Sequence, residues 1–385
     1  MTAPFERERA VAEAAVLRAA ILTKNVQSRV SAVSKADATP VTVADFAAQA
    51  LLISALHAAF PGDGFLGEED SLALRNDAQL CNQVYNLVVS SAADAVASGG
   101  GDGEALAGPS SVDEMLSLID LGGAGQGGPT GRFWVMDPID GTATFLKGQQ
   151  YAVALALIEN GREVVGVLAC PSLKVADDGG VYDDVVDADG LGVLLAAVKG
   201  QGATIRRFPS AATASLLSSP ATPLPPLLPP AIATTTTTAA AAENSLTSRL
   251  RFVDCQRSTS TNHGLPRTLA GRLGARYPGL DVWASHVRYA ALVLGAADAW
   301  VRLGARPDAV FYVWDNAGAQ LLFTERGGRV TDFDGRAMEF GAGRDLRANR
   351  GMVAARADVH GVLLEMANEV LAAQVDAAKA NQQGR

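Results

Sequence analysis

The sequence predicts an α/β protein in which helices and sheets form layers, rather than one doubly wound parallel sheet. Long apolar segments without glycine or proline, typical of helices, alternate with short apolar runs typical of buried strands. Two of these runs are joined by Asn160-Gly161, a strong β-hairpin signal. A hairpin adds an antiparallel pair, so the mixed order of elements favours a layered arrangement. The 385 residues suffice for two modest domains that share a large core.

Residues 1–172 are expected to form an N-terminal α+β domain. A helix is predicted from Glu8 to Val26, and a polar loop from Lys35 to Pro40 follows it. Further helices are predicted at Ala44 to Phe60, Leu80 to Ala97 and, more briefly, Val112 to Ile119. Strands are predicted at Phe65 to Gly67, Phe133 to Met136, Tyr151 to Ile158 and Val164 to Cys170. We interpret residues 93–131, which hold two glycine-rich patches, as an insertion.

Residues 173–385 are expected to form a second α/β domain. A strand pair is predicted at Gly190 to Gly200 and Ala203 to Arg207. The segment from Ser210 to Thr247 is proline-, threonine- and alanine-rich without a period that could bury one face, so we interpret it as a disordered surface insertion. Beyond it, strands are predicted at Arg251 to Cys255, Ala299 to Leu303 and Arg329 to Thr331, and helices at Leu265 to Arg276, Ser285 to Gly295, Asp315 to Arg326 and Val359 to Ala378.

The composition argues against several classes of protein. A net charge of -9 disfavours a nucleic-acid polymer as the main partner, because such proteins usually present a basic face. No apolar run reaches the ~18–20 residues of a membrane helix, and the N-terminus lacks the features of a signal or transit peptide. We therefore expect a cytoplasmic protein that does not bind membranes. The three distant cysteines form no disulfide framework or zinc motif.

Acidic side chains stand where the predicted elements begin or end. They are Asp45 at a helix start, Glu68-Glu69-Asp70 after a short strand, Asp137 and Asp140 around a proline, and Asp315 in the segment VWDNAG. Carboxylates without histidine or cysteine partners suit hard cations such as Mg2+. Close carboxylates repel one another unless cations lie between them. Gly141-Thr142 is predicted to begin a helix whose free N–H groups bind phosphate, while the Thr142 hydroxyl orients a water.

Each acidic group also has a purely structural interpretation. Asp45 could simply start its helix, and Asp315 could act only as an N-cap. Glu68-Glu69-Asp70 could be a solvated charge run. The sequence DPIDGT is a credible turn, because aspartate, proline and glycine all favour turns. The combination and order of the groups favour a site over four unrelated features.

The motifs resemble those of the lithium-sensitive, Mg2+-dependent phosphomonoesterases that include inositol monophosphatase. Within that superfamily the chain most resembles the 3′(2′),5′-bisphosphate nucleotidases. The matching segments are KADATPVTVADFAAQAL (35–51), GEEDS (67–71), WVMDPIDGT (134–142), FLKGQQYAVALALIENGREVVGVLACP (145–171) and VWDNAGAQLLFTERGGRVTDFDG (313–335). They cover most of the chain outside the two insertions. The resemblance implies an αβαβα sandwich of two α/β subdomains, the first carrying the metal site and the second binding substrate.

The resemblance also implies a role for each matching residue. The expected metal ligands are Glu68, Asp137, Asp140, Asp315 and the carbonyl of Ile139. Asp45 and Thr142 would form the dyad that activates water, and Gly141 and Thr142 would donate backbone N–H groups to the phosphate. The expected nucleotide contacts are Ser285, Arg288, Arg302 and, on a looser alignment, His263. Two or three Mg2+ ions would bridge the phosphate, one of which Li+ would replace to inhibit turnover.

The implied activity is hydrolysis of the 3′-phosphate of adenosine 3′,5′-bisphosphate, and of its sulfated form, to AMP and phosphate, as in sulfur metabolism. We expect a monomer. The chain departs from the nucleotidase pattern at Ala143-Thr144, at Arg288 and at Asn316, and these departures concern the choice of substrate and not the phosphatase chemistry. The alternatives are an inositol monophosphatase or inositol polyphosphate 1-phosphatase, and a catalytically silent phosphate-binding regulator.

Overall fold

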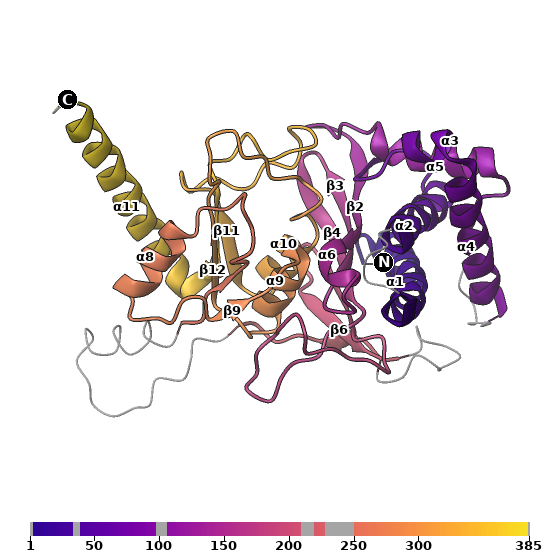
Figure 1. The fold of residues 1–385 in the computed structure, drawn as a ribbon, viewed down its shortest axis with the longest axis horizontal. Helices are drawn as coiled ribbons and strands as arrows, with labels where there is room; N and C mark the ends of the chain where they lie inside the picture. The colour runs from indigo at the N-terminus through magenta and orange to yellow at the C-terminus, as the bar shows by residue number, and fades with distance from the viewer. Residues whose placement is uncertain (1–2, 34–38, 98–105, 209–218, 228–249, 384–385) are drawn as a thin grey trace.

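Five layers make up the fold of this protein, which is described from a computed structural model (Figure 1). The structure describes residues 3–33, 39–97, 106–208, 219–227 and 250–383. From the N-terminal side, a helical layer covers a seven-stranded sheet, a second helical layer separates that sheet from a three-stranded one, and a third helical layer closes the far side. The predicted αβαβα sandwich is therefore confirmed.

The large sheet contains seven strands in chain order. They are β1 (Gly64–Gly67), β2 (Arg132–Asp140), β3 (Ala152–Glu159), β4 (Arg162–Cys170), β5 (Val193–Val198), β6 (Ala203–Arg207) and β7 (Thr222–Pro223). Only the β1–β2 pair is parallel. Strands β2 to β5 are nearly continuous apolar runs because helices cover both faces of the sheet. The β3–β4 hairpin turns at Asn160 and Gly161, both with positive φ, as the sequence predicts.

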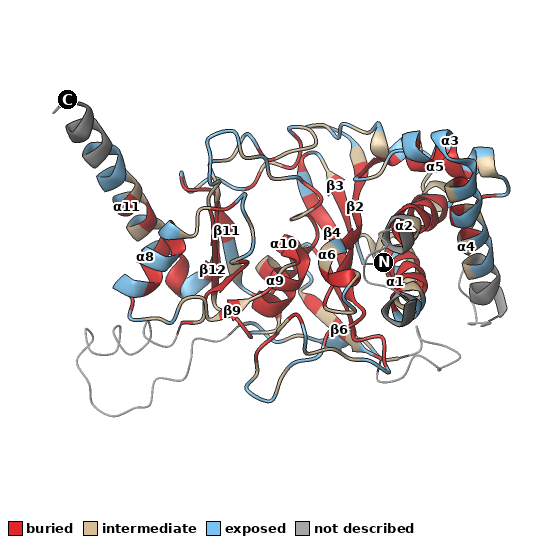
Figure 2. Ribbon diagram, in the orientation of Figure 1, coloured by how far each residue is buried: buried red, intermediate tan, exposed pale blue. Residues whose placement is uncertain are grey.

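The N-terminal helical layer packs on one face of this sheet. It contains α1 (Glu6–Val33) and α2 (Thr39–Ala59), with α3 (Leu72–Asn76), α4 (Ala78–Ala97) and α5 (Val112–Gly123) outside them. Helix α2 is apolar on every side because it lies between α1, α4, α5 and strand β2. Buried residues follow the sheets and the inner helix faces in Figure 2, so the core of this half lies between α1, α2 and the sheet.

The middle layer contains α9 (Ser285–Val293) and α10 (Ala319–Glu325), which contact the large sheet on its other face. The second sheet has the order β10 (Ala299–Arg302), β12 (Met352–Arg356), β11 (Gly328–Thr331), and both pairs are antiparallel. A two-stranded sheet joins β8 (Val253–Asp254) to β9 (Leu280–Asp281). Helices α8 (Gly264–Arg272) and α11 (Ala357–Gln383) cover the far face. No described helix is both long and apolar enough to cross a membrane.

Several sequence predictions need correction. The expected domain boundary at residues 172 and 173 falls inside the large sheet, whose strands continue to Pro223. The expected loop from Lys35 to Pro40 gives way to helix α2 at Thr39, and its other residues lie outside the described ranges. The predicted helix from Asp315 to Arg326 begins only at Ala319. Strand β12 was not predicted, although all five of its residues are buried.

Part of the expected insertion from Ser210 to Thr247 belongs to the fold. Residues 219–227 are described, and within them β7 pairs with β6 at the sheet edge. Leu224 and Leu227 pack against the core between the large sheet and the middle layer, and the Leu227 amide donates to the Arg326 carbonyl at 2.7 Å. The rest of the segment lies outside the described residues.

Candidate active site

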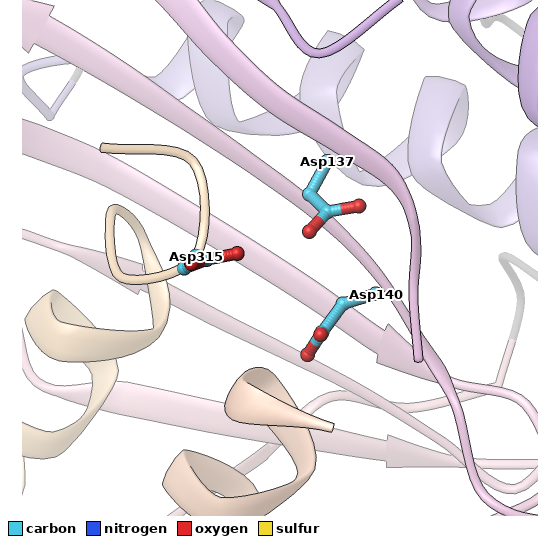
Figure 3. Close-up of side chains that lie close together, drawn as sticks. All are labelled: Asp137, Asp140 and Asp315. Carbon is cyan, nitrogen blue, oxygen red and sulfur yellow. The ribbon is translucent and has the colours of Figure 1, made fainter. Parts of the chain in front are cut away.

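Three carboxylates from distant parts of the chain converge at the carboxyl end of β2 (Figure 3). Asp137 and Asp140 belong to β2, and Asp315 lies in the turn before α10. One oxygen from each side chain lies within 4.8 Å of one from each of the others. Figure 3 shows the side chains pointing toward a common centre, so the structure brings together three of the four carboxylates that the motifs predict as metal ligands.

A β-bulge explains how Asp137 and Asp140 share one site. In a regular strand, residues three apart point to opposite faces of the sheet. Here Asp137 pairs with Ala154 and Asp140 pairs with Ala152, so three steps on β2 match two on β3. The extra residue rotates the strand and returns Asp140 to the side of Asp137. Pro138 fits within the bulge because it has no N–H to contribute to the ladder.

A close backbone contact brings Asp315 to the sheet. A Cβ atom on Gly166 of β4 would lie 2.4 Å from the Gly318 carbonyl oxygen, so only glycine allows this approach. Gly318 has φ of 84° and donates its N–H to Glu163 Oε1 at 2.7 Å. Gly318, and not Asp315, is the N-cap of α10. The structural interpretation of Asp315 as a helix cap is therefore wrong, and its carboxylate is left for the cluster.

Asp140 is fixed by the N-terminus of α9. Its carboxylate accepts hydrogen bonds from the backbone N–H groups of Ser285, at 3.2 Å, and of His286. The positive end of the helix dipole stabilises a negative charge at this place. The His286 side chain is fully buried and its Nε2 lies 2.7 Å from the carbonyl oxygen of Trp314, the residue before Asp315. Helix α9 thus connects the segments that carry two of the three carboxylates.

Glu68 approaches the cluster from the end of β1. The Gln49 side chain on α2 holds the backbone of Glu69, accepting from its N–H at 3.0 Å and donating to its carbonyl at 2.7 Å. Glu68 remains accessible to solvent, yet surrounding protein atoms displace much of its water. That loss of water, followed by the charges of Glu69 and Asp315, raises the pKa of Glu68 to about 8. Glu68 faces the same site but lies outside the tight group of three.

The electrostatics of the cluster call for a cation. Burial, and then the neighbouring carboxylates, raise the pKa of Asp137 well above its ordinary value, and burial also raises the pKa of Asp140. Among the described residues, Asp137 Oδ1 is buried and has no hydrogen-bond partner. An unpartnered buried oxygen within an all-oxygen group of carboxylates fits a hard divalent cation such as Mg2+.

The two residues of the expected dyad, Asp45 and Thr142, lie on helices α2 and α6 without a hydrogen bond between their side chains in the described structure. Asp45 is buried on α2, one turn before Gln49, and burial followed by the charges of Glu69 and Glu68 raises its pKa well above the ordinary value. Asp45 therefore lies inside its helix and does not start it. Thr142 is exposed at the first position of α6 (Thr142–Phe145). No hydrogen bond joins these two described residues, so their partnership stays a prediction.

The turn that follows Asp140 depends on the glycine at position 141. Gly141 has φ of 96°, and a Cβ there would lie 2.8 Å from Thr144 Oγ1 and 2.9 Å from Ala284 Cβ. Thr144, one of the departures from the nucleotidase pattern, is buried and its hydroxyl donates to the Gly141 carbonyl at 2.8 Å. The Thr144 side chain therefore stabilises the turn.

Two buried arginines lie beside the carboxylates. Arg302 ends β10 with its Nη2 3.8 Å from Asp315 Oδ2, and its guanidinium lies 3.8 Å from the Phe311 ring centroid. Burial lowers the pKa of Arg302 to about 10, although the charge of Asp315 opposes the shift. Arg288 donates to Ser285 Oγ at 2.8 Å and lies over the Trp300 ring. Among the described residues, Arg288 Nε and Arg302 Nη1 are buried without partners, which leaves donors for an anion.

His263 has no free ring nitrogen for a nucleotide. Its Nδ1 lies 2.7 Å from the buried carboxylate of Asp254, and its Nε2 lies 2.8 Å from the Ser258 carbonyl. These two acceptors raise the pKa of His263, although partial burial opposes the shift. Tyr277 and Gln256 donate to the same carboxylate, so the histidine belongs to a network that joins the ends of β8 and α8.

Sequence reasoning missed His286 as a link between the carboxylates, Glu163 as the acceptor of the Gly318 N–H, and Arg344, whose side chain donates to the Gly67 carbonyl before Glu68. The position of His286 directly after Ser285, an expected nucleotide contact, was a visible signal, whereas Glu163 lies on an ordinary strand. Arg344 lies in an irregular loop, where no periodic pattern marks it.

A sequence model described as "Inositol monophosphatase family" matches residues 6–377. The chain belongs to the inositol monophosphatase family. It is 36% identical over 375 residues to a 3′(2′),5′-bisphosphate nucleotidase of Emericella nidulans, covering 95% of this chain and 99% of that one. A protein of the same name from Schizosaccharomyces pombe is 35% identical, with 91% and 92% covered. One from Oryza sativa is 32% identical, with 97% of each covered. The resemblance inferred from the motifs is confirmed.

Solved structures of this family share the fold. Inositol monophosphatase II from Staphylococcus aureus superposes with a TM-score of 0.53 at 17% identity, covering 98% of each chain. An inositol monophosphatase from Zymomonas mobilis gives a TM-score of 0.54 at 16% identity, covering 95% of this chain and 100% of that one.

Proposed function

We propose that this protein is an Mg2+-dependent 3′(2′),5′-bisphosphate nucleotidase that hydrolyses the 3′-phosphate of adenosine 3′,5′-bisphosphate, and of its sulfated form, to AMP and phosphate. The observation that carries the proposal is the group of buried Asp137 and Asp140 with half-buried Asp315, in which Asp137 Oδ1 has no described hydrogen-bond partner. Its specific form rests on near full-length similarity to fungal and plant proteins of that name.

The residues divide into metal ligands and water-activating groups. Asp137, Asp140 and Asp315 would hold the cations, joined by Glu68 and the Ile139 carbonyl. When bound, Mg2+ supplies a lowered pKa for a coordinated water and neutralises charge on the phosphate, and Li+ in its place would inhibit. The Thr142 hydroxyl would accept a hydrogen bond from the attacking water.

Asp45 would hold the proton that the attacking water releases. Burial, followed by the charges of Glu69 and Glu68, raises the pKa of this carboxyl, which favours its taking up a proton. For the dyad to form, the exposed Thr142 at the start of α6 would have to bring its hydroxyl to Asp45.

The substrate would be held at both of its phosphates. The backbone N–H groups of Gly141 and Thr142 would face the reacting phosphate. Arg288, Arg302 and Ser285 would bind the other phosphate, since the two guanidinium groups carry buried donors without described partners. This arginine pair favours a substrate with two separate phosphates over inositol 1-phosphate. The presence of every expected metal ligand and of both expected dyad residues argues against a silent phosphate-binding regulator.

A phosphate-release panel with Mg2+ tests the proposal. It compares adenosine 3′,5′-bisphosphate with inositol 1-phosphate and inositol 1,4-bisphosphate. The proposal predicts the highest kcat/KM for the nucleotide. A preference for either inositol substrate would refute the nucleotidase assignment while leaving the phosphatase chemistry, and release from none of the three would favour the regulator.

The monomeric state and cytoplasmic location remain predictions. Sedimentation of the purified chain and microscopy of a tagged copy would check them.

A further inference from the structure

Arg344 lies in the loop between β11 and β12, on the C-terminal side of the site. Its backbone carbonyl accepts from the N–H of Val313 at 3.0 Å, and the N–H of Leu346 donates to the Phe311 carbonyl at 2.8 Å. The loop is thus paired with the residues that lead directly to Asp315. Arg344 is therefore anchored to the segment that delivers one carboxylate of the cluster.

The Arg344 side chain reaches across to the N-terminal half. Its Nη2 donates to the Gly67 carbonyl at 2.7 Å, and Gly67 immediately precedes Glu68. Its Nη1 donates to the carbonyls of Gly123, at 3.0 Å, and Gly125, at 2.9 Å, at the end of α5. Carbonyls at a helix C-terminus lack intrahelical donors and carry partial negative charge. A planar guanidinium presents a separate Nη group to each set of carbonyls, whereas a lysine ammonium offers a single nitrogen.

The glycine-rich run after α5, interpreted from sequence as part of an insertion, explains why these carbonyls are available. A Cβ on Gly123 would lie 2.6 Å from the Glu69 carbonyl oxygen, and a Cβ on Gly125 would lie 1.7 Å from the Phe65 carbonyl oxygen. Only glycines let this turn pack against β1 so closely. The turn and the end of β1 therefore form one surface for the Arg344 guanidinium.

The same guanidinium also contacts the residue before Asp315. Its Cζ lies 4.7 Å from the ring centroid of Trp314, which is buried. A planar cation over an indole ring is a favourable contact. The Arg344 guanidinium therefore joins Gly67, which precedes Glu68, to Trp314, which precedes Asp315.

We propose that Arg344 is a positioning residue that fixes the distance between Glu68 and Asp315, carboxylates supplied by opposite halves of the chain. This inference rests on the proposed metal-dependent function. If Arg344 positions the two carboxylates, its loss should weaken metal binding. Charge alone predicts tighter metal binding when Arg344 is neutralised, because a cation beside a metal site repels a second cation. The sign of the change in metal affinity therefore separates positioning from simple electrostatics.

Binding of Mn2+, followed by the electron paramagnetic resonance signal of the free ion, tests the proposal without relying on turnover. The variants are Arg344→Gln, Arg344→Lys and the matched control Arg350→Gln. Arg350 lies in the same loop, binds Asp334 and lies over Phe333, but it touches neither ligand-bearing segment. We expect the Mn2+ dissociation constant to rise roughly ten- to a hundredfold in both Arg344 variants and to stay unchanged in Arg350→Gln.

Unchanged or tighter Mn2+ binding in a folded Arg344 variant would overturn the positioning role. If Arg344→Gln fails to fold, the comparison of Arg344→Lys with Arg350→Gln decides the matter, because lysine keeps the charge and loses the fork. Asp140→Asn separates the two proposals. Loss of Mn2+ binding in that variant with normal binding in the Arg344 variants would refute the positioning role alone. Normal binding in Asp140→Asn would refute the metal site and the positioning role together.

Discussion

The carboxylate of Asp140 accepts a hydrogen bond from the backbone N–H of Ser285 at 3.2 Å, although 145 positions separate the two residues in the chain. The contact places a carboxylate of the large sheet on the N-terminus of α9, whose next turn carries Arg288. The proposed metal ligands and the proposed phosphate contacts therefore share one helix. A change at either residue is expected to affect both cation binding and substrate binding.

Asp140→Asn is expected to lower the rate of phosphate release about a hundredfold or more, because the amide cannot replace a charged oxygen ligand. The asparagine oxygen can still accept a hydrogen bond from α9, so the fold should be kept. Asp113→Asn, on the exposed first turn of α5, serves as the control. Near-normal turnover in Asp140→Asn would refute the role of this carboxylate.

Arg302→Gln is expected to raise KM for adenosine 3′,5′-bisphosphate roughly ten- to a hundredfold, the cost of losing a hydrogen bond to a charged group. The KM for adenosine 3′-phosphate, which has no second phosphate, should change much less. Steady-state kinetics at saturating Mg2+ measure both values. Arg306→Gln, at a highly exposed arginine nearby, should change neither. An equal effect of Arg302→Gln on the two substrates would contradict the proposed phosphate contact.

Gly166→Ala is expected to push the turn that carries Asp315 away from the sheet, because the new Cβ would meet the Gly318 backbone. The free energy of unfolding should fall by about 1–3 kcal/mol, as for other overpacked sites. More Mg2+ should be needed for half-maximal activity. Urea titration and a Mg2+ activity curve measure the two effects. Gly271→Ala, on α8 with open space around its Cα, should be neutral or stabilising.

His360 is expected to destabilise the fold in acid. It is fully buried, and burial, with a smaller contribution from the charge of Arg329, lowers its pKa from 6.5 to about 4. The neutral ring is favoured in the folded state, so its contribution to stability is complete above pH 6.5 and is lost as the pH falls toward 4. The largest loss is roughly 3 kcal/mol.

Urea unfolding between pH 4 and 8 measures this dependence. His360→Gln keeps a hydrogen-bond donor but cannot titrate, so its unfolding free energy should fall less steeply in acid than that of the wild type. Parallel curves for the two proteins would show that the wild-type histidine is not held neutral.

The three clustered carboxylates could be predicted as one site because their motifs are local in sequence. The spacing of Asp137 and Asp140 around Pro138 indicates a shared site, but the bulge that makes it possible depends on the pairing of β2 with β3. Register is a property of two strands, and no single segment encodes it. The same reason explains why Gly166 was not recognised, since its role appears only when Gly318 lies against it.

Residues outside regular elements were harder to predict. Arg344 acts through carbonyl groups 219–277 positions away, and the loop around it has no periodic pattern. Strand β7 was missed for a different reason. Its two residues lie in a low-complexity segment, and the half-buried Leu224 and Leu227 stand among prolines that obscure any alternation. Composition describes the average of such a segment and not the few residues that pack.

A competition experiment tests the central claim most directly. The wild-type protein is given equal concentrations of adenosine 3′,5′-bisphosphate and inositol 1-phosphate with Mg2+, and 31P nuclear magnetic resonance follows every phosphate signal. We predict that the 3′-phosphate signal of the nucleotide disappears first, that the 5′-phosphate signal of AMP remains, and that chelation of Mg2+ stops the change. Earlier loss of the inositol 1-phosphate signal, or removal of the 5′-phosphate, would contradict the proposed function.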